Sequence, residues 1–263
     1  MKIVRKINCF ILLVSAFFIY LPVYANPDAL TIMKRVDQRD DGETRTMNTK
    51  LTLINKNGGQ RVRQMVSYAK NYDGEVKQVM LFTKPNDVKG VANLSYEYDD
   101  LNKDDAMWLY LPALRKARRI SGSARNGNFM GSDFTYDDMG DRKPEEDKHK
   151  LLREEKHDGV NCWVIESKPF DSTDMYSKRI SWVRQDNDVI SYVEYYDRQG
   201  KLLKTLNVKD IKKVNGFWIA GILEMHNVQD DHKTIINNTN IMFNKPLEDR
   251  LFRVSTLERG QLK

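Results

Sequence analysis

The sequence predicts a mainly β protein built on one strongly curved antiparallel sheet. Two observations carry this prediction. Short segments in which apolar and polar residues alternate follow one another along most of the chain, and turn-forming pairs such as Asp73-Gly74 and Asn215-Gly216 separate them. Only one early segment has apolar residues at helical spacing. Regularly spaced short strands with tight turns are typical of an antiparallel sheet that is strongly curved or closed.

The first 25 residues have the pattern of a cleavable secretory signal peptide. Three cations precede a nearly continuous apolar run at residues 7–21, and Val23-Tyr24-Ala25 resembles a cleavage signal. The apolar run is shorter than the roughly 20 residues that a membrane span needs. We therefore expect residues 1–25 to be removed and residues 26–263 to form a single domain in the periplasm.

The composition of the exported chain argues against a nucleic-acid partner. The whole sequence has a net charge of +6, and the signal peptide contributes three cations and no acid, which leaves +3. A domain that binds nucleic acid is expected to be strongly basic. Cys162 is the one cysteine after residue 25, so no intramolecular disulfide is expected. We expect it to be buried as a small apolar side chain.

One helix is expected at the start of the mature chain. Asn26-Pro27-Asp28 supplies a cap, a proline suited to the first helical position and an acid at the positive end of the helix dipole. Gly42 is expected to end the helix. The apolar stripe is expected to consist of Leu30, Met33 and Val36, with Ala29 as a further candidate.

Strands are expected along the rest of the chain. Asn57-Gly58-Gly59 is a strong hairpin signal between the first two. Short helical turns are expected around residues 134–140 and 246–252. The expected strands are 44–55, 60–69, 76–83, 91–98, 106–111, 150–155, 160–167, 179–185, 189–196, 201–211, 218–228 and 234–243.

Residues 107–139 are the most informative stretch. In its first strand Met107, Leu109 and Leu111 would point to one side, and Trp108 and Tyr110 to the other. Both sides are apolar. A strand that lines a cavity has this pattern, and so does an ordinary core strand covered on both sides. The sequence alone leaves both interpretations open.

A run of cations follows that strand, with no acid from Arg115 to Arg125. Such a run is usually a solvated surface. The alternative is a surface that binds lipid headgroups or an anionic membrane, which attracts each Lys or Arg by about 1 kcal/mol. A nucleic-acid site is a third interpretation, and export from the cytoplasm argues against it.

The motifs of common enzymes are absent from the sequence. The glycine-rich piece at 122–131 lacks the ending of a P-loop, and neither G-x-S-x-G nor H-E-x-x-H occurs. Glu224 and His226 share a strand face, and His232 is expected across a hairpin from His226. Three well-placed ligands are usual for zinc, so we expect no metal site there. Because the motifs of common enzymes are absent, we also expect no cofactor and no enzymatic activity.

Several segments of the chain together form the pattern of one protein family. They are Phe82-Thr83-Lys84-Pro85, Gly90-Val91-Ala92-Asn93-Leu94, Trp108-Leu109-Tyr110-Leu111-Pro112, Arg118-Arg119-Ile120, Phe129 to Asp138, Leu251-Phe252-Arg253 and Leu257-Glu258-Arg259-Gly260. With these segments the chain resembles the outer-membrane lipoprotein-sorting-like proteins of bacterial periplasms, which are related to the lipoprotein carrier LolA. The resemblance covers most of the mature chain and is strongest from Leu81 to Asp141.

The resemblance implies a half-open antiparallel β-barrel with helices covering its concave face and a hydrophobic cavity for acyl chains between them. It also implies a monomeric carrier that shuttles between the two membranes, touches them transiently and works with an inner-membrane transporter of the RND or MMPL type. Burying one CH₂ is worth about 0.8 kcal/mol, so a chain of about sixteen carbons gains roughly 12 kcal/mol on leaving water. A carrier needs an apolar site in which the chain gains a comparable free energy of burial.

These considerations select two groups of candidate residues. The candidates for the cavity wall are Met65, Met80, Phe82, Met107, Trp108, Tyr110, Phe129, Met130 and Phe134. The candidates for docking a headgroup or a partner are Arg115, Arg118, Arg119 and Arg125. In particular, we expect Trp108, Tyr110 and Phe129 to line or gate one acyl-sized pocket.

The sequence therefore favours a non-enzymatic periplasmic carrier of lipid or lipoprotein acyl chains. A scaffold subunit docked on a membrane transporter is the alternative from another class. An enzyme acting on lipid or envelope polymer is a third. Lipid that co-purifies with the protein would favour the carrier, and an empty protein bound to a transporter would favour the scaffold.

Overall fold

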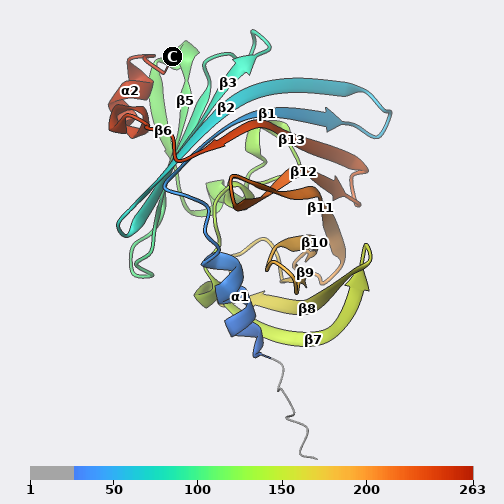
Figure 1. The fold of residues 1–263 in the computed structure, drawn as a ribbon. Helices are drawn as coiled ribbons and strands as arrows, with labels where there is room; N and C mark the ends of the chain where they lie inside the picture. The colour runs from blue at the N-terminus through green and yellow to red at the C-terminus, as the bar shows by residue number, and fades with distance from the viewer. Residues whose placement is uncertain (1–26, 263) are drawn as a thin grey trace, which may run out of the picture.

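The computed structural model describes residues 27–262, which form one 13-stranded antiparallel sheet with two short α-helices (Figure 1). The prediction of a mainly β protein with an open, curved sheet is confirmed. The expected signal peptide, residues 1–25, lies outside the described residues. The strands are β1 (Thr44–Ile54), β2 (Gln60–Tyr72), β3 (Glu75–Lys84), β4 (Ala92–Tyr98), β5 (Ala106–Leu111), β6 (Lys116–Ile120), β7 (Asp147–His157), β8 (Val160–Pro169), β9 (Lys178–Arg184), β10 (Ile190–Tyr196), β11 (Leu202–Val214), β12 (Phe217–Asn227) and β13 (His232–Phe243).

The sheet consists of two meanders joined by the first and last strands. Its order is β6-β5-β4-β3-β2-β1-β13-β12-β11-β10-β9-β8-β7. Strand β1 pairs with β13 in antiparallel register, for example Leu51 with Ile236. Strands β6 and β7 are therefore the two free edges, and residues 121–146 connect them. Figure 1 shows the sheet curling between these edges.

Turn chemistry accounts for the hairpins. Between β11 and β12, Asn215 and Gly216 have φ of 51° and 92°. Two left-handed residues make the type I′ turn that fits the twist of a two-residue hairpin, and Asn-Gly is the sequence that adopts it most easily. The expected helical turns are also present, as short 3₁₀ segments at Asp137–Met139 and Asp249–Phe252.

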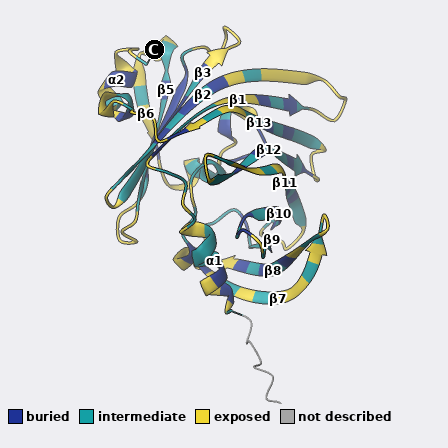
Figure 2. Cartoon of the chain, viewed as in Figure 1, coloured by how far each residue is buried: buried dark blue, intermediate teal, exposed yellow. Residues whose placement is uncertain are grey.

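The largest core lies on the concave side of the sheet. Figure 2 marks buried residues in dark blue along the strands. We call it the concave core. Its buried members are Leu51, Leu53, Met65, Met80, Phe82, Val88, Val91, Phe129, Phe134, Tyr176, Val193, Tyr195, Leu206, Met225 and Ile236. A separate outer cluster covers the other face of β3–β5 and consists of Val79, Ala92, Leu94, Tyr110, Phe252 and Leu257.

Helix α1 (Ala29–Asp37) differs in detail from the expected helix. Its cap is Asp28, which accepts a hydrogen bond from the Thr31 amide, and not Asn26. It ends before Gln38, well ahead of Gly42. Its buried residues are Ala29 and Ile32, whereas Leu30 is 38% exposed. The helical stripe runs through Ala29, Ile32, Met33 and Val36, because these positions are three or four residues apart.

The two helices cover opposite faces of the sheet. Helix α1 packs on Ile165 of β8 and Val183 of β9, at the β7 end of the concave face. Helix α2 (Val254–Glu258) packs through Leu257 on the outer cluster. Only α1 therefore covers part of the concave face. Within the described chain, no helix is long and apolar enough to cross a membrane.

Candidate lipid-binding site

The connection between the free edges fills the concave side of the sheet. We call residues 122–140 the plug. The plug has only short 3₁₀ turns and one isolated bridge, between Asn128 and Thr135. Phe129 is fully buried, and its ring lies 5.9 Å from that of Phe82 on β3. Phe134 is 3% exposed in the same core. Aromatic rings of the plug thus occupy the apolar face of the sheet.

Polar contacts hold the plug to both meanders, through β2 and β13. Arg63 of β2 donates a hydrogen bond to the carbonyl of Met130. The Asp133 amide donates to Thr234 Oγ1 at 2.9 Å, and this hydroxyl donates to Asp133 Oδ2 at 2.7 Å. His232 Nδ1 lies 2.7 Å from the same carboxylate oxygen. Since Asp133 and Thr234 are buried, these contacts form in a medium where an unpaired polar group is costly.

Lys204 of β11 is a buried cation beneath the plug. Its Nζ donates to the Asp133 carbonyl at 2.6 Å and lies 3.1 Å from Tyr176 Oη. Asp138 Oδ2 is 3.9 Å from the ammonium and accepts a hydrogen bond of 2.8 Å from Tyr176. Burial lowers the pKa of Lys204, and the charges of Asp138 and Asp133 oppose that shift. The lysine therefore ties the plug to the second meander.

A charged cleft of about 590 Å³ lies beside the plug, between the end of β6 and the segment leading into β7. Its walls come from the β4–β5 and β8–β9 loops, residues 121–126 and residues 142–146. Leu101 and Phe170 line it and are 56% and 70% exposed. The cleft thus combines a charged interior with two exposed apolar side chains.

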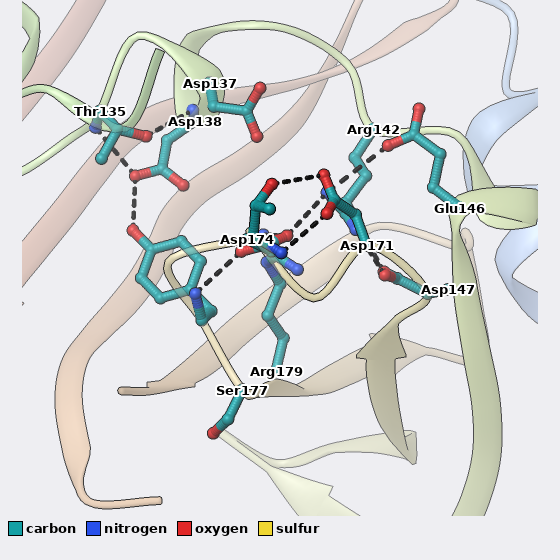
Figure 3. A network of polar contacts seen from close by, with 12 residues as sticks. Thr135, Asp137, Asp138, Arg142, Glu146, Asp147, Asp171, Asp174, Ser177 and Arg179 are labelled. Carbon is teal, nitrogen blue, oxygen red and sulfur yellow. Dashed lines mark hydrogen bonds and ion pairs between the residues drawn. The ribbon is translucent and has the colours of Figure 1, made fainter. Parts of the chain in front are cut away.

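Arg142 is the central cation of the cleft (Figure 3). Its guanidinium makes a two-point contact with Asp147, at 2.6 Å and 2.9 Å, and reaches Asp174 at 3.1 Å. Arg179 also contacts Asp174, at 3.1 Å. Two-point pairs between arginine and carboxylate are strong and geometrically specific. This network fixes the start of β7 against the β8–β9 loop.

Glu97 contacts Asp141, the residue that precedes Arg142 of the cleft. Its Oε2 accepts a hydrogen bond of 3.3 Å from the Asp141 amide. Burial, with the nearby charges of Asp141 and Asp105, raises the pKa of Glu97 to about 8. This shift favours the protonated form of the carboxyl, and in that form it can donate a hydrogen bond.

The structure divides the expected cavity residues between two faces. Phe82, Phe129 and Phe134 join the concave core, as do Met65 and Met80, and Met130 packs against it. Met107 is buried. Tyr110 belongs to the outer cluster, where Trp108 packs beside it. The expectation that Trp108, Tyr110 and Phe129 line one pocket is therefore wrong, because Trp108 and Tyr110 share the outer face of β5 whereas Phe129 of the plug lies in the concave core.

An apolar pocket of about 210 Å³ does lie next to Tyr110, on the outer face. Leu81, Pro112, Leu257 and Leu262 contribute to its lining. It lies between the sheet and the C-terminal segment, so it is separate from the concave core. Its small volume suits a fragment of an acyl chain and not a whole one.

The four candidate arginines do not form one patch. Arg115 has a left-handed φ of 49° in the β5–β6 turn and is exposed. Arg118 and Arg119 are exposed on the edge strand β6, and Arg119 reaches the cleft. Arg125 also lines the cleft, but its guanidinium is paired with Asp137 at 3.0 Å. Arg119 and Arg125 are thus the two that share the cleft.

Some important residues were not among the sequence candidates. Lys204, Tyr176 and Asp138 are distant in sequence, and nothing in the local pattern distinguishes a buried lysine from a solvated one on β11. Glu97 alternates with apolar residues like an ordinary exposed strand position. In the described residues no group of three or more His, Cys, Asp or Glu side chains is placed to hold a metal ion. Cys162 is buried with a free thiol.

An open, strongly curved antiparallel sheet with a covered apolar concave face defines the LolA-like fold. The crystal structure of a LolA superfamily protein from Nitrosomonas europaea has this fold, with a TM-score of 0.67 and 19% identity over 86% of this chain and 98% of that one.

The chain belongs to the outer membrane lipoprotein-sorting protein family. A Vibrio parahaemolyticus domain named for outer membrane lipoprotein sorting is 32% identical, with a TM-score of 0.82 over 88% of this chain and 98% of that one. A DUF1329 family protein from Desulfovibrio piger is 29% identical, with a TM-score of 0.82 over 87% and 97%. A family model described as an uncharacterized protein matches residues 74–259. No curated protein matches the chain.

Proposed function

We propose that this protein is a periplasmic, non-enzymatic carrier that binds the acyl chains of lipids or lipoproteins between the concave face of the sheet and the plug. The observation that carries this proposal is the composition of the concave core. An apolar surface runs across both meanders, and a connection without regular strands or long helices covers it. Displacing the plug would open an apolar trough without breaking the sheet.

The free energies involved make such an exchange possible. An acyl chain of about sixteen carbons gains roughly 12 kcal/mol on leaving water. Burial of Phe129 and Phe134 contributes about 1.5–3 kcal/mol each, and each hydrogen bond of the plug about 1 kcal/mol. The free energy gained by burying the acyl chain is therefore at least as large as the free energy lost when the plug is displaced. The difference between the two remains small enough for the chain to be released.

The proposal includes delivery towards the outer membrane with help from an inner-membrane transporter of the RND or MMPL type. The name of the Vibrio parahaemolyticus relative supports sorting as the context. The charged cleft, with exposed Leu101 and Phe170 at its wall, is the surface we assign to the transporter. The protein works as a monomer in this scheme.

A scaffold subunit is the second candidate function. The observation that favours it is the filled concave side, where Phe129 and Phe134 occupy the space that a cargo would need. In that case the plug never leaves, and the charged cleft alone carries the function.

Native mass spectrometry of protein purified from periplasm without detergent separates these two functions. The carrier predicts bound species whose masses match acylated molecules. Substitution Phe129→Trp should reduce their amount by overfilling the core, whereas the outer-face substitution Tyr110→Phe should not. A protein that is empty in every preparation, yet purifies with a membrane transporter, would establish the scaffold instead.

Vesicle binding tests the membrane contact. The double substitution Arg118→Glu with Arg119→Glu should weaken sedimentation with anionic vesicles, and added salt should weaken the wild-type protein in the same way. A matched pair on the exposed part of β11, Lys212→Glu with Lys213→Glu, serves as the control for net charge. Equal losses in both variants would exclude a specific role for β6.

A further inference from the structure

Asn93 is a polar side chain enclosed in an apolar wall. It lies in β4 and is 1% exposed. Its register partners are Met80 of β3 and Leu109 of β5, so it faces the concave side. Met80 belongs to the concave core and Leu109 packs against it. A carboxamide in such surroundings is costly unless its hydrogen bonds are made.

Neither end of the Asn93 carboxamide has a partner. Both Nδ2 and Oδ1 are buried and make no hydrogen bond. Among the described residues, Asn93 is the one side chain with an unpartnered buried donor and an unpartnered buried acceptor together. Buried polar groups nearly always have partners, so a carboxamide in an apolar wall with neither its donor nor its acceptor paired needs an explanation.

The same face of β4 leads from Asn93 to the charged cleft. Ser95 and Glu97 follow at alternate positions, and Ser95 Oγ donates to Glu97 Oε1 at 3.2 Å. Glu97 accepts from the Asp141 amide beside Arg142, which lines the cleft. At about 3.3 Å per residue, Asn93 and Glu97 are about 13 Å apart along the strand. A polar stripe thus runs from the apolar wall towards Arg142, which lines the cleft.

We infer that Asn93 binds the ester or amide linkage at the point where an acyl chain joins its head group. This inference rests on the proposed carrier function and names the chemical class of the cargo. Nδ2 donates to the carbonyl oxygen of the linkage, and Oδ1 accepts from the N–H when the linkage is an amide. The hydrocarbon then lies along the concave core, and the head group follows Ser95 and Glu97 to the cleft. A hydrocarbon leaves the carboxamide without a partner, and an ether lipid offers Nδ2 only an ether oxygen, which is a weaker acceptor than a carbonyl.

Two lipids that differ in one carbonyl test the inference. The probes are 1-monopalmitoylglycerol and its hexadecyl ether, each measured by fluorescence displacement on the purified wild-type protein. We expect the ester to bind about tenfold more tightly, as one buried hydrogen bond to an otherwise unpartnered group implies. In Asn93→Leu the preference should disappear while ether binding is retained. In Leu94→Met, a volume-conserving change next to Asn93 on the outer face of β4, the preference should persist.

Each result has one meaning. Equal binding of ester and ether by wild-type protein overturns the inference and leaves the carrier function standing. So does a preference that survives in Asn93→Leu. If folded wild-type protein binds neither lipid, the carrier function itself fails. The wild-type comparison needs no variant, so the inference stays testable even if Asn93→Leu does not fold.

Discussion

On the concave side, burial changes the pKa of individual side chains. Glu97 is the clearest example, because burial beside Asp141 and Asp105 raises its pKa to about 8. A carboxyl whose pKa is raised by folding binds its proton more tightly in the folded protein than in the unfolded chain. Its contribution to stability is therefore largest below the unfolded pKa near 4.5 and is lost as the pH rises through 8.

The substitution Glu97→Gln should remove this pH dependence. Between pH 5 and pH 8, we expect the free energy of unfolding of the wild-type protein to fall relative to that of the variant. The relative change should be of the order of 2–4 kcal/mol. Urea unfolding at pH 5, 6, 7 and 8 measures it. Parallel curves for the two proteins would show that the carboxyl titrates normally.

Lys204 is the second residue whose surroundings decide its role. Replacement by methionine keeps the side-chain length but removes the donor to the Asp133 carbonyl and to Tyr176 Oη. Removing one partner of a buried charged pair typically destabilises by about 3–5 kcal/mol, so Lys204→Met should lose about 3 kcal/mol or more in urea unfolding.

A lysine on the same strand provides the control for Lys204. The side chain of Lys209 is 52% exposed and pairs with Glu224 at 2.8 Å. Exposed ion pairs contribute about 1 kcal/mol or less. If Lys204→Met and Lys209→Met cost the same, Lys204 does not hold the plug.

At the level of secondary-structure elements, β7 is protected against pairing with another chain, and α1 is stabilised by packing on the sheet. Strand β7 is an 11-residue edge, and it carries many charged residues and a register shift between Leu151 and Arg153. Charges and bulges on an edge discourage pairing with another chain. Helix α1 has nine residues, too few to be stable alone, so packing on Ile165 and Val183 stabilises it.

Two residues of α1 test this packing. Ile32 is fully buried, and Ile32→Ala should reduce the free energy of unfolding by about 2–4 kcal/mol. Leu30 is 38% exposed, and Leu30→Ala should change it by less than about 0.5 kcal/mol. Thermal and urea unfolding measure both. The reverse order would mean that α1 packs in the register first expected from the sequence, through Leu30.

For the whole molecule, the stability of the open sheet does not depend on the plug that controls access to its concave face. The strands pair with each other from β6 through to β7 without needing the plug, because its contacts with them are side-chain contacts and not ladder hydrogen bonds. The plug can therefore change position while the sheet stays intact. Thr234 is well placed to control this, since its hydroxyl contacts both the amide and the carboxylate of Asp133.

The substitution Thr234→Val keeps the shape of the side chain and removes those contacts. We expect lipid uptake to become several-fold faster, because loss of about 1–3 kcal/mol of plug stabilisation raises the population of the open state. Stopped-flow binding of a fluorescent fatty acid measures the rate. Thr239→Val, at an exposed position of the same strand, should leave uptake unchanged. An unchanged rate in Thr234→Val would mean that the plug does not limit entry.

The sequence by itself determined the class of fold and most of the strands. Alternation has a period of two residues, and turn pairs such as Asn215-Gly216 interrupt it, so these signals can be read locally. Strand β6 was not among the expected strands, because its exposed cations Arg118 and Arg119 resemble those of a loop. The family resemblance was also carried by contiguous residues, and the comparisons confirm it.

Only the tertiary structure decided which side of each strand faces the plug and which distant residues meet there. Alternation separates Trp108 and Tyr110 from Met107 and Leu109, but it does not say which set lies on the concave side. Curvature and the pairing of β1 with β13 decide that, and both depend on residues far apart in the chain. For the same reason, the sequence did not predict the contact between Lys204 and Asp133 or the carboxamide of Asn93 that has no hydrogen-bond partner. Whether a residue is buried depends on how the whole molecule packs, so it cannot be read from the sequence of a single strand.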